Sequence, residues 1–225
     1  MAYGWIHQEI NVSPKYSSTK KDLRSPTKKS ELAEVQKLSL EKLNFVCDRR
    51  SDSLELVKFY NSTGGQNWIN KWDLNKSLDS WYGIGLNNEG CVKYIDLDGK
   101  SDGIKDSFLT NNLTGSLISL NLNQLEGLLI PNNKISGSIP ELLNLPNLTT
   151  LVLEANQFSG EIPGFSNLQN LKQLWLNDNK LTGNIVNFNL PALQELNLSR
   201  NLLKGTIPNF DKIPNVYWLF LVRIN

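Results

Sequence analysis

The chain has 225 residues, of which 38 are Leu and 29 are Asn, so that two residue types make up about 30% of it. A composition so far from that of a mixed globular domain indicates an internal repeat. The 23 basic and 22 acidic residues give a net charge of +1, which argues against a protein that binds nucleic acid or a membrane surface through its overall charge. The sequence contains no run of ~18 consecutive apolar residues, so it predicts no membrane span. Its first residues lack the features of a secretory signal.

Residues 1–29 carry six basic and two acidic side chains among Ser, Thr and Pro. This composition predicts a disordered basic tail, and a basic targeting segment or partner-binding arm is the alternative. From Ser30 apolar residues recur at intervals of three and four, which predicts a helix over about 31–46.

A second helix is predicted over about 53–61. Asp52 and Glu55 are placed to accept hydrogen bonds from the free amides of its first turn, and Gly64 with Gly65 provides a left-handed stop. The segment that follows is rich in turn residues and tryptophan. It predicts an irregular module that covers the start of the repeats, packed around Trp68, Trp72, Trp81 and Tyr82.

The repeats have the apolar pattern L-x-x-L-x-L. Copies begin at Val92, Leu125, Leu148, Leu171, Leu193 and Val216, at steps of 33, 23, 23, 22 and 23 residues. Each copy predicts a short strand that buries its apolar side chains on one side, and stacked copies predict a parallel sheet over one continuous core. The long first step predicts an excursion of the chain over residues 99–109.

An Asn follows most of these units, and a Gly stands four residues after it. The Asn residues are Asn111, Asn133, Asn156, Asn179 and Asn201. Because an amide offers two donors and an acceptor, we expect them to form an internal ladder that satisfies buried backbone groups. We expect the glycines, Gly137, Gly160, Gly183 and Gly205, to meet tight backbone geometry that a Cβ would obstruct.

This pattern resembles the plant-type leucine-rich repeat, LxxLxLxxNxLxGxIP, over residues 92–225. Residues 52–91 resemble the cap that precedes such repeats in plant receptors and bacterial surface proteins. The resemblance implies an α/β solenoid: a curved, right-handed leucine-rich repeat superhelix with a parallel sheet on its concave face and a short helical N-terminal cap. The predicted domains are the tail (1–29), the cap (30–91) and the repeat array (92–225).

Two further expectations concern the cysteines and the last repeat. Cys47 and Cys91 border the cap; the oxidising compartment that the resemblance implies favours a disulfide between them, and two buried free thiols are the alternative. The last unit has Ile224 where the ladder has Asn. It therefore predicts a truncated or degenerate copy of a longer array, or an edge that a dimer buries.

No catalytic or phosphate-binding motif is present. Asp102 and Asp106 lack the dense carboxylate pattern of a calcium loop. We therefore expect no enzymatic activity, no cofactor and no metal.

The side chains between the strand leucines are the ones that face a partner across the concave face. The candidate ligand-binding residues are Leu129, Val152, Glu154, Gln173, Trp175, Asn177, Glu195, Asn197, Trp218 and Phe220. Trp175 is the first choice, because aromatic anchors dominate interfaces and also stack on sugars. With the family resemblance, this face predicts a non-enzymatic module that binds a protein or carbohydrate at the cell surface or outside the cell. A structural or adhesive spacer, or an ectodomain fragment of a larger receptor, is the alternative.

Overall fold

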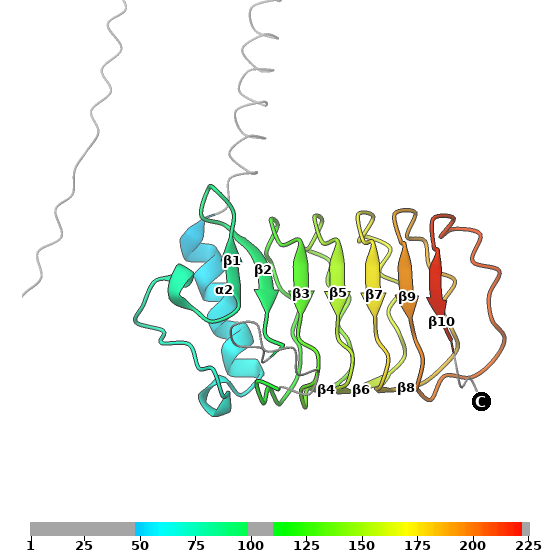
Figure 1. Cartoon of the computed structure of the whole chain (residues 1–225), viewed down its shortest axis with the longest axis horizontal. Helices are drawn as coiled ribbons and strands as arrows, with labels where there is room; N and C mark the ends of the chain where they lie inside the picture. Colours follow the sequence, from blue (N-terminus) through cyan, green and yellow to red (C-terminus); the bar gives the residue numbers. More distant parts are fainter. Residues whose placement is uncertain (1–47, 99–109, 222–225) are drawn as a thin grey trace, which may run out of the picture. The chain divides into compact units, whose positions relative to one another are not determined.

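The computed structural model describes residues 48–98 and 110–221. The basic tail, the helix predicted at 31–46, the excursion at 99–109 and Ile224 lie outside the described residues. The described chain begins with helix α2 (Arg49–Ser62), which is followed by the 3-10 turns η1 (Gly65–Asn67) and η2 (Leu78–Ser80). The strands of the repeat array come after these turns, as Figure 1 shows.

Helix α2 begins four residues earlier than predicted. Its N-cap is Asp48, whose Oδ1 accepts a hydrogen bond from the backbone N–H of Arg50 at 2.9 Å. The capping role expected of Asp52 is therefore wrong. Asp52 is instead buried, and its Oδ2 accepts the backbone N–H of Val92 at 2.9 Å, which ties the helix to the first strand of the array. The helix ends as expected, because Gly64 has the left-handed backbone conformation (φ 68°).

The tryptophan-rich segment packs against α2 through its rings. Trp68 and Trp72 lie with ring centroids 4.9 Å apart, and Trp72 stacks on Trp81, also at 4.9 Å. Tyr60 of the helix contacts both Trp68 (4.9 Å) and Trp72 (5.6 Å). Tyr82 packs on the edge of this core. The cap therefore has an aromatic core of its own.

Seven strands of the described chain form one sheet, and they stand side by side in chain order (Figure 1). Six are parallel and have the predicted registers: β2 (Val92–Asp96), β3 (Gly127–Leu129), β5 (Thr150–Val152), β7 (Gln173–Trp175), β9 (Glu195–Asn197) and β10 (Trp218–Phe220). The seventh, β1 (Ile84–Leu86), pairs antiparallel with β2 and was not predicted. A smaller parallel sheet, also not predicted, contains β4 (Ser136–Gly137), β6 (Gln157–Gly160) and β8 (Lys180–Leu181).

The core of the array contains columns of fully buried side chains that recur from β3 to β9, whereas the equivalent Leu219 of β10 is 42% exposed. Leu128, Leu151, Leu174 and Leu196 form one such column, and each is 0% exposed. Because one strand of three residues buries little surface alone, the sheet gains its stability from the contacts between neighbouring repeats. The fold is thus a leucine-rich repeat solenoid with a parallel sheet and an N-terminal helical cap.

The Asn residues that follow the strands are buried, and their amides bond to the backbone. In Asn156, Nδ2 donates to the carbonyl oxygens of Ile130 (2.9 Å) and Leu153 (3.3 Å), and Oδ1 accepts from the N–H of Ile135 (3.1 Å). Asn133, Asn179 and Asn201 make the same kind of bonds. Each amide reaches back to the preceding repeat, not onward to the next one. Asn111 differs, since its Oδ1 accepts from the backbone N–H of Asn70 in the cap.

The repeat glycines have a left-handed backbone, and only some of them are crowded. A Cβ added to Gly183 or Gly205 would come within 2.9 Å or 2.5 Å of a side-chain atom, as expected. Gly137 and Gly160 have φ values of 83° and 80°, yet a Cβ added to either would have no heavy atom nearer than 3.8 Å. The expected steric reason is therefore wrong at these two positions. The positive φ, which side-chain-bearing residues rarely adopt, is what requires glycine there.

A second row of Asn side chains, not predicted, runs just before the strands. Asn147, Asn170 and Asn215 donate from Nδ2 to backbone carbonyls of the preceding repeat, those of Asn123 (2.8 Å), Pro146 (2.9 Å) and Pro191 (2.7 Å). We call this row the outer ladder. Ala192 occupies the corresponding position before β9 and interrupts it.

Cys91 is disulfide-bonded, and none of the described cysteines is free. The other cysteine of the sequence, Cys47, lies outside the described residues.

Candidate functional site

The candidate site is the concave face, by which we mean the side of the seven-stranded sheet that the strand leucines do not occupy. Alternation within each strand creates it: Leu174 of β7 is fully buried, whereas its neighbours Gln173 and Trp175 are partly exposed. The structure therefore places Trp175 on the side opposite the leucine core, as the alternation predicts.

The ten candidate residues are not equally accessible. Leu129, Glu154, Gln173, Trp175, Glu195, Asn197 and Trp218 are partly exposed, and Phe220 is 40% exposed. Val152 and Asn177 are each only 5% exposed. Val152 lies in register between the larger side chains of Leu129 and Trp175, and the Nδ2 of Asn177 bonds to Oδ2 of Asp178 at 2.7 Å. These two residues therefore offer little surface to a ligand.

Three aromatic side chains gather at the C-terminal end of the face. The ring centroids of Trp175 and Trp218 are 5.4 Å apart with an interplanar angle of 56°, and those of Trp218 and Phe220 are 4.8 Å apart at 68°. We call Trp175, Trp218 and Phe220 the aromatic cluster. Since their strands are β7 and β10, the cluster spans the intervening strand β9.

The polar residue at the centre of this end is Glu195 of β9. Its Cα pairs with those of Gln173 on one side and Trp218 on the other. The carboxylate accepts a hydrogen bond from Nε2 of Gln173 at Oε2 (2.8 Å) and from the hydroxyl of Tyr217 at Oε1 (3.2 Å). The bond to Glu195 raises the pKa of the Tyr217 hydroxyl, with smaller contributions from desolvation and from the charge of the carboxylate.

Tyr217 is 72% exposed and was not among the predicted site residues. It precedes the strand, outside the alternating positions from which we predicted the face. An aromatic residue directly before a strand with two further aromatics could have indicated it.

At the far margin of the face, Asn197 and Arg200 make local bonds. Oδ1 of Asn197 accepts from both the N–H (3.2 Å) and the Oγ (2.7 Å) of Ser199. Arg200 pairs with Asp178, with Nε and Oδ1 2.9 Å apart. The cation of Arg200 is thus already engaged by a carboxylate of the neighbouring repeat.

The N-terminal end of the face carries one aromatic ring that was also not predicted. Tyr94 of β2 is 40% exposed, and its ring lies over Gly127 of β3, where a Cβ would come within 2.7 Å of it. Its hydroxyl donates to Oε2 of Glu126 (3.0 Å), which also pairs with Lys93 at 3.2 Å. Alternation in the first repeat unit could have indicated Tyr94, since it stands directly before the buried Ile95.

Trp175 also carries an unsatisfied polar group. Its indole Nε1 is buried and has no hydrogen-bond partner among the described residues, and the same holds for Oδ1 of Asn177. Buried polar groups without partners are uncommon in folded proteins, and each one costs free energy. Two of them therefore lie close in sequence on one repeat of this face.

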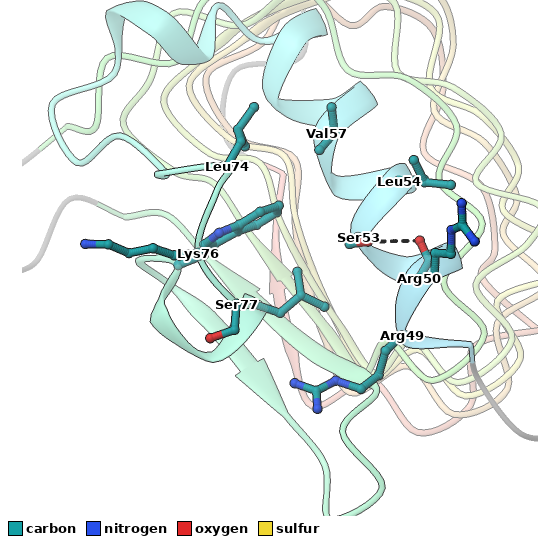
Figure 2. A pocket seen from close by; sticks show the side chains of 10 residues that line it. Arg49, Arg50, Ser53, Leu54, Val57, Leu74, Lys76 and Ser77 are labelled. Carbon is teal, nitrogen blue, oxygen red and sulfur yellow. Dashed lines mark hydrogen bonds between the residues drawn. The ribbon is translucent and has the colours of Figure 1, made fainter. Parts of the chain in front are cut away.

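The cap contains a separate cavity, shown in Figure 2. It has a volume of about 450 Å³ and lies between α2 and the loop that carries Leu74 and Lys76. Buried Leu78 and Trp81 form part of its lining, and Arg49 stands at one end of it. None of the predicted ligand-binding residues lines this cavity.

Neither a metal cluster nor a membrane helix occurs in the part of the chain that the structure describes. No three His, Cys, Asp or Glu side chains of residues 48–98 and 110–221 gather where they could hold a metal ion. No helix in these ranges is long and apolar enough to cross a lipid bilayer.

Comparison with known proteins identifies the repeat. The family model described as Leucine Rich Repeat matches residues 192–211. The chain is a plant-type leucine-rich repeat protein. Among curated proteins, a search finds no match to the chain.

Solved structures extend the similarity beyond one repeat. The leucine-rich repeat ectodomain of the receptor kinase SOBIR1 from Arabidopsis thaliana is 28% identical, with a TM-score of 0.58 over 75% of this chain and 89% of that one. The BIR3–SERK2 complex from the same plant gives 27% identity and a TM-score of 0.56 over 71% and 86%. The ectodomain of GASSHO1/SCHENGEN3, in complex with CASPARIAN STRIP INTEGRITY FACTOR 2, is 30% identical with a TM-score of 0.64, and covers 75% of this chain and 20% of the receptor. This leucine-rich repeat protein therefore resembles the ectodomains of plant receptor kinases.

Proposed function

We propose that this leucine-rich repeat protein is a non-enzymatic recognition module that binds a peptide or protein on its concave face, outside the cell or at its surface. The observation that carries the proposal is the aromatic cluster of Trp175, Trp218 and Phe220. Trp175 lies on the side of β7 opposite the buried Leu174, and Trp218 and Phe220 pair in register with Glu195 and Asn197 of the same face. Large aromatic side chains that converge on an accessible face are typical of binding hot spots.

The solved relatives support this type of function. One of them is a complex of two proteins, BIR3 and SERK2, and another is a receptor ectodomain in complex with CASPARIAN STRIP INTEGRITY FACTOR 2. The disulfide at Cys91 supports an oxidising location. The strands of the face are hydrogen-bonded to their neighbours, and a surface that is ordered before binding lowers the entropic cost of binding.

A display library of random 12-residue peptides, selected on the immobilised full chain, tests the proposal even though the natural ligand is unidentified. We expect the enriched peptides to bind the Trp175→Ala variant at least about 30-fold more weakly, the loss expected of a hot-spot residue of ~2 kcal/mol or more. The matched control is Ile69→Ala, which removes a side chain that is 65% exposed in the cap. This control should leave the affinity unchanged.

Three other outcomes would contradict the proposal. Peptides that keep their affinity for Trp175→Ala but lose it for Ile69→Ala would move the site to the cap. Binding to a glycan array that depends on Trp175, with no peptide enriched, would replace the peptide with a carbohydrate. A library without any Trp175-dependent binder would favour the structural spacer.

A further inference from the structure

Glu195 lies among the aromatic rings at the C-terminal end of the concave face. Its strand neighbour in register is Trp218, which contacts both Trp175 and Phe220. Aromatic rings carry partial negative charge on their faces, and a cation within ~6 Å of a ring centroid is attracted to it. A carboxylate beside such rings adds a full negative charge to the same place.

Among the described residues, no cation pairs with the carboxylate of Glu195. Its two hydrogen-bond donors, the amide of Gln173 and the hydroxyl of Tyr217, are both neutral. Arg200 forms its ion pair with Asp178, and Lys93 forms its ion pair with Glu126 at the other end of the sheet. Neither of these cations pairs with Glu195.

The two neutral donors also hold the carboxylate in place. Gln173 of β7 donates to Oε2, and Tyr217, the residue directly before β10, donates to Oε1. The two oxygens are therefore held from the two neighbouring strands. Carboxylate oxygens accept more than one hydrogen bond each, so both can still accept from an incoming ammonium or guanidinium group. A side chain fixed before binding loses little conformational entropy when the ligand arrives.

We infer that Glu195 and the aromatic cluster form a subsite for a basic side chain, a lysine or arginine of the peptide or protein that the concave face binds. This inference rests on the proposed function and adds the chemistry of the ligand to it. The aliphatic stem of the basic residue packs on Trp218 and Phe220, and its charged end meets Glu195. Ring faces and a carboxylate together select a cation over a neutral side chain of the same length.

NMR titration of the full chain with small amino-acid amides tests the subsite directly. The probe is Nα-acetyl-lysine N-methylamide, and the readout is the indole N–H resonances of Trp175 and Trp218, assigned with Trp175→Phe and Trp218→Phe. The norleucine amide has the same aliphatic stem without the amine, and the glutamate amide has the opposite charge. We expect saturable shifts with the lysine compound and affinities at least about fivefold weaker with the other two.

Two variants separate charge from packing. Glu195→Gln retains an acceptor and the shape of the side chain but removes the charge, so it should weaken binding of the lysine amide at least about fivefold. Glu141→Gln removes an exposed carboxylate in the loop between β4 and β5, which is not one of the candidate ligand-binding residues, and should change the affinity less than twofold, because distant exposed charges are screened. Raising the salt concentration from 20 to 300 mM should weaken binding to the unmodified chain and leave Glu195→Gln nearly unaffected.

Equal affinity for the lysine and norleucine amides, or equal affinity of Glu195→Gln and the unmodified chain, would overturn the inference. The absence of any shift at Trp175 and Trp218 would overturn it as well. The proposed function survives this result if library peptides without basic residues still depend on Trp175. The proposed function itself fails if no library peptide depends on Trp175 for its binding.

Discussion

The cap and the repeat array are stabilised in different ways. In the cap, the ring of Trp72 contacts those of Tyr60, Trp68 and Trp81, and Tyr60 also contacts Trp68. None of these contacts is repeated elsewhere among the described residues. In the array, the repeats of β3, β5, β7 and β9 supply the same buried leucine and the same kind of Asn amide, so these neighbouring repeats are nearly equivalent. A cap substitution therefore removes an interaction without a substitute, whereas an array substitution weakens one of several similar interfaces.

The largest effect is expected for Trp68→Ala in the cap. Trp68 is 1% exposed, contacts Phe59, Tyr60 and Trp72, and donates from Nε1 to the carbonyl oxygen of Thr63 at 2.8 Å. Its removal should lower the free energy of unfolding by ~3–5 kcal/mol, measured by urea denaturation. Trp68→Phe keeps most of the ring contacts and loses the hydrogen bond, so it should cost clearly less. Equal losses for the two variants would show that the hydrogen bond, not the packing, dominates.

Leu174→Ala tests the array in the same way. Leu174 is 0% exposed at the centre of β7, so the cavity should cost ~2–5 kcal/mol in urea denaturation. Trp175→Ala, one residue further on the opposite side of the strand, opens no core cavity and should cost no more than ~1 kcal/mol. A loss for Trp175→Ala as large as that for Leu174→Ala would make Trp175 a structural residue and remove it from the proposed site.

The link between the two regions is Asp52, whose carboxylate binds the N–H of Val92. Asp52→Ala leaves this buried N–H without a partner and should cost ~1–3 kcal/mol. Asp52→Asn keeps an acceptor and removes the charge, so it should cost less at neutral pH.

Burial raises the pKa of Asp52 above its ordinary value of 3.8, although the hydrogen bond from Val92 opposes the shift. The folded chain therefore binds this proton more tightly than the unfolded chain does. The resulting stabilisation is fully present below pH 3.8 and is lost as the pH rises through the folded-state pKa. Urea midpoints from pH 3.5 to 7 should thus shift in favour of Asp52→Asn as the pH rises. A constant difference between the two proteins across this range would rule out a raised pKa.

The sequence predicted the array far better than the cap, and the reason is repetition. Six copies of one apolar pattern place the six parallel strands of the larger sheet in register, because every copy is subject to the same packing requirement. The smaller parallel sheet has no such apolar pattern and was not predicted. The start of α2 was misplaced because Asp52 resembles a capping residue locally, while its partner Val92 is 40 residues away. Strand β1 has a single, non-repeated pairing with β2, so no periodicity indicates it.

The concave face was predictable only in part. Alternation identified the direction of Trp175, but it did not reveal that Val152 and Asn177 are 5% exposed or that Tyr217 binds Glu195. Those facts depend on the sizes of neighbouring side chains and on residues outside the strands. The cavity in the cap likewise depends on how a loop packs against α2, which no spacing in the sequence describes.

The smallest change in stability is expected for a substitution in the outer ladder. It tests directly whether a side-chain hydrogen bond that recurs between repeats stabilises the array. Asn147, Asn170 and Asn215 each stand one residue before a strand unit and donate to the preceding repeat. Ala192 stands one residue before Leu193, and the same geometry places the backbone carbonyl of Gln169 as its counterpart. Ala192→Asn should therefore raise the free energy of unfolding by ~0.5–1.5 kcal/mol, the net worth of one hydrogen bond.

The matched control is Ala192→Asp, which has nearly the same shape but, when ionised, no donor. It should not stabilise the chain, because its carboxylate would face a carbonyl oxygen. A gain in unfolding free energy with Asn but not with Asp would show that an outer-ladder hydrogen bond can be added at the repeat that lacks one. Equal gains with both variants would assign the effect to side-chain packing and would show that the hydrogen bonds of the outer ladder do not contribute to stability. Since the change lies in the array and not in the cap, it should leave the effects of Trp68→Ala unaltered, because distant substitutions are additive.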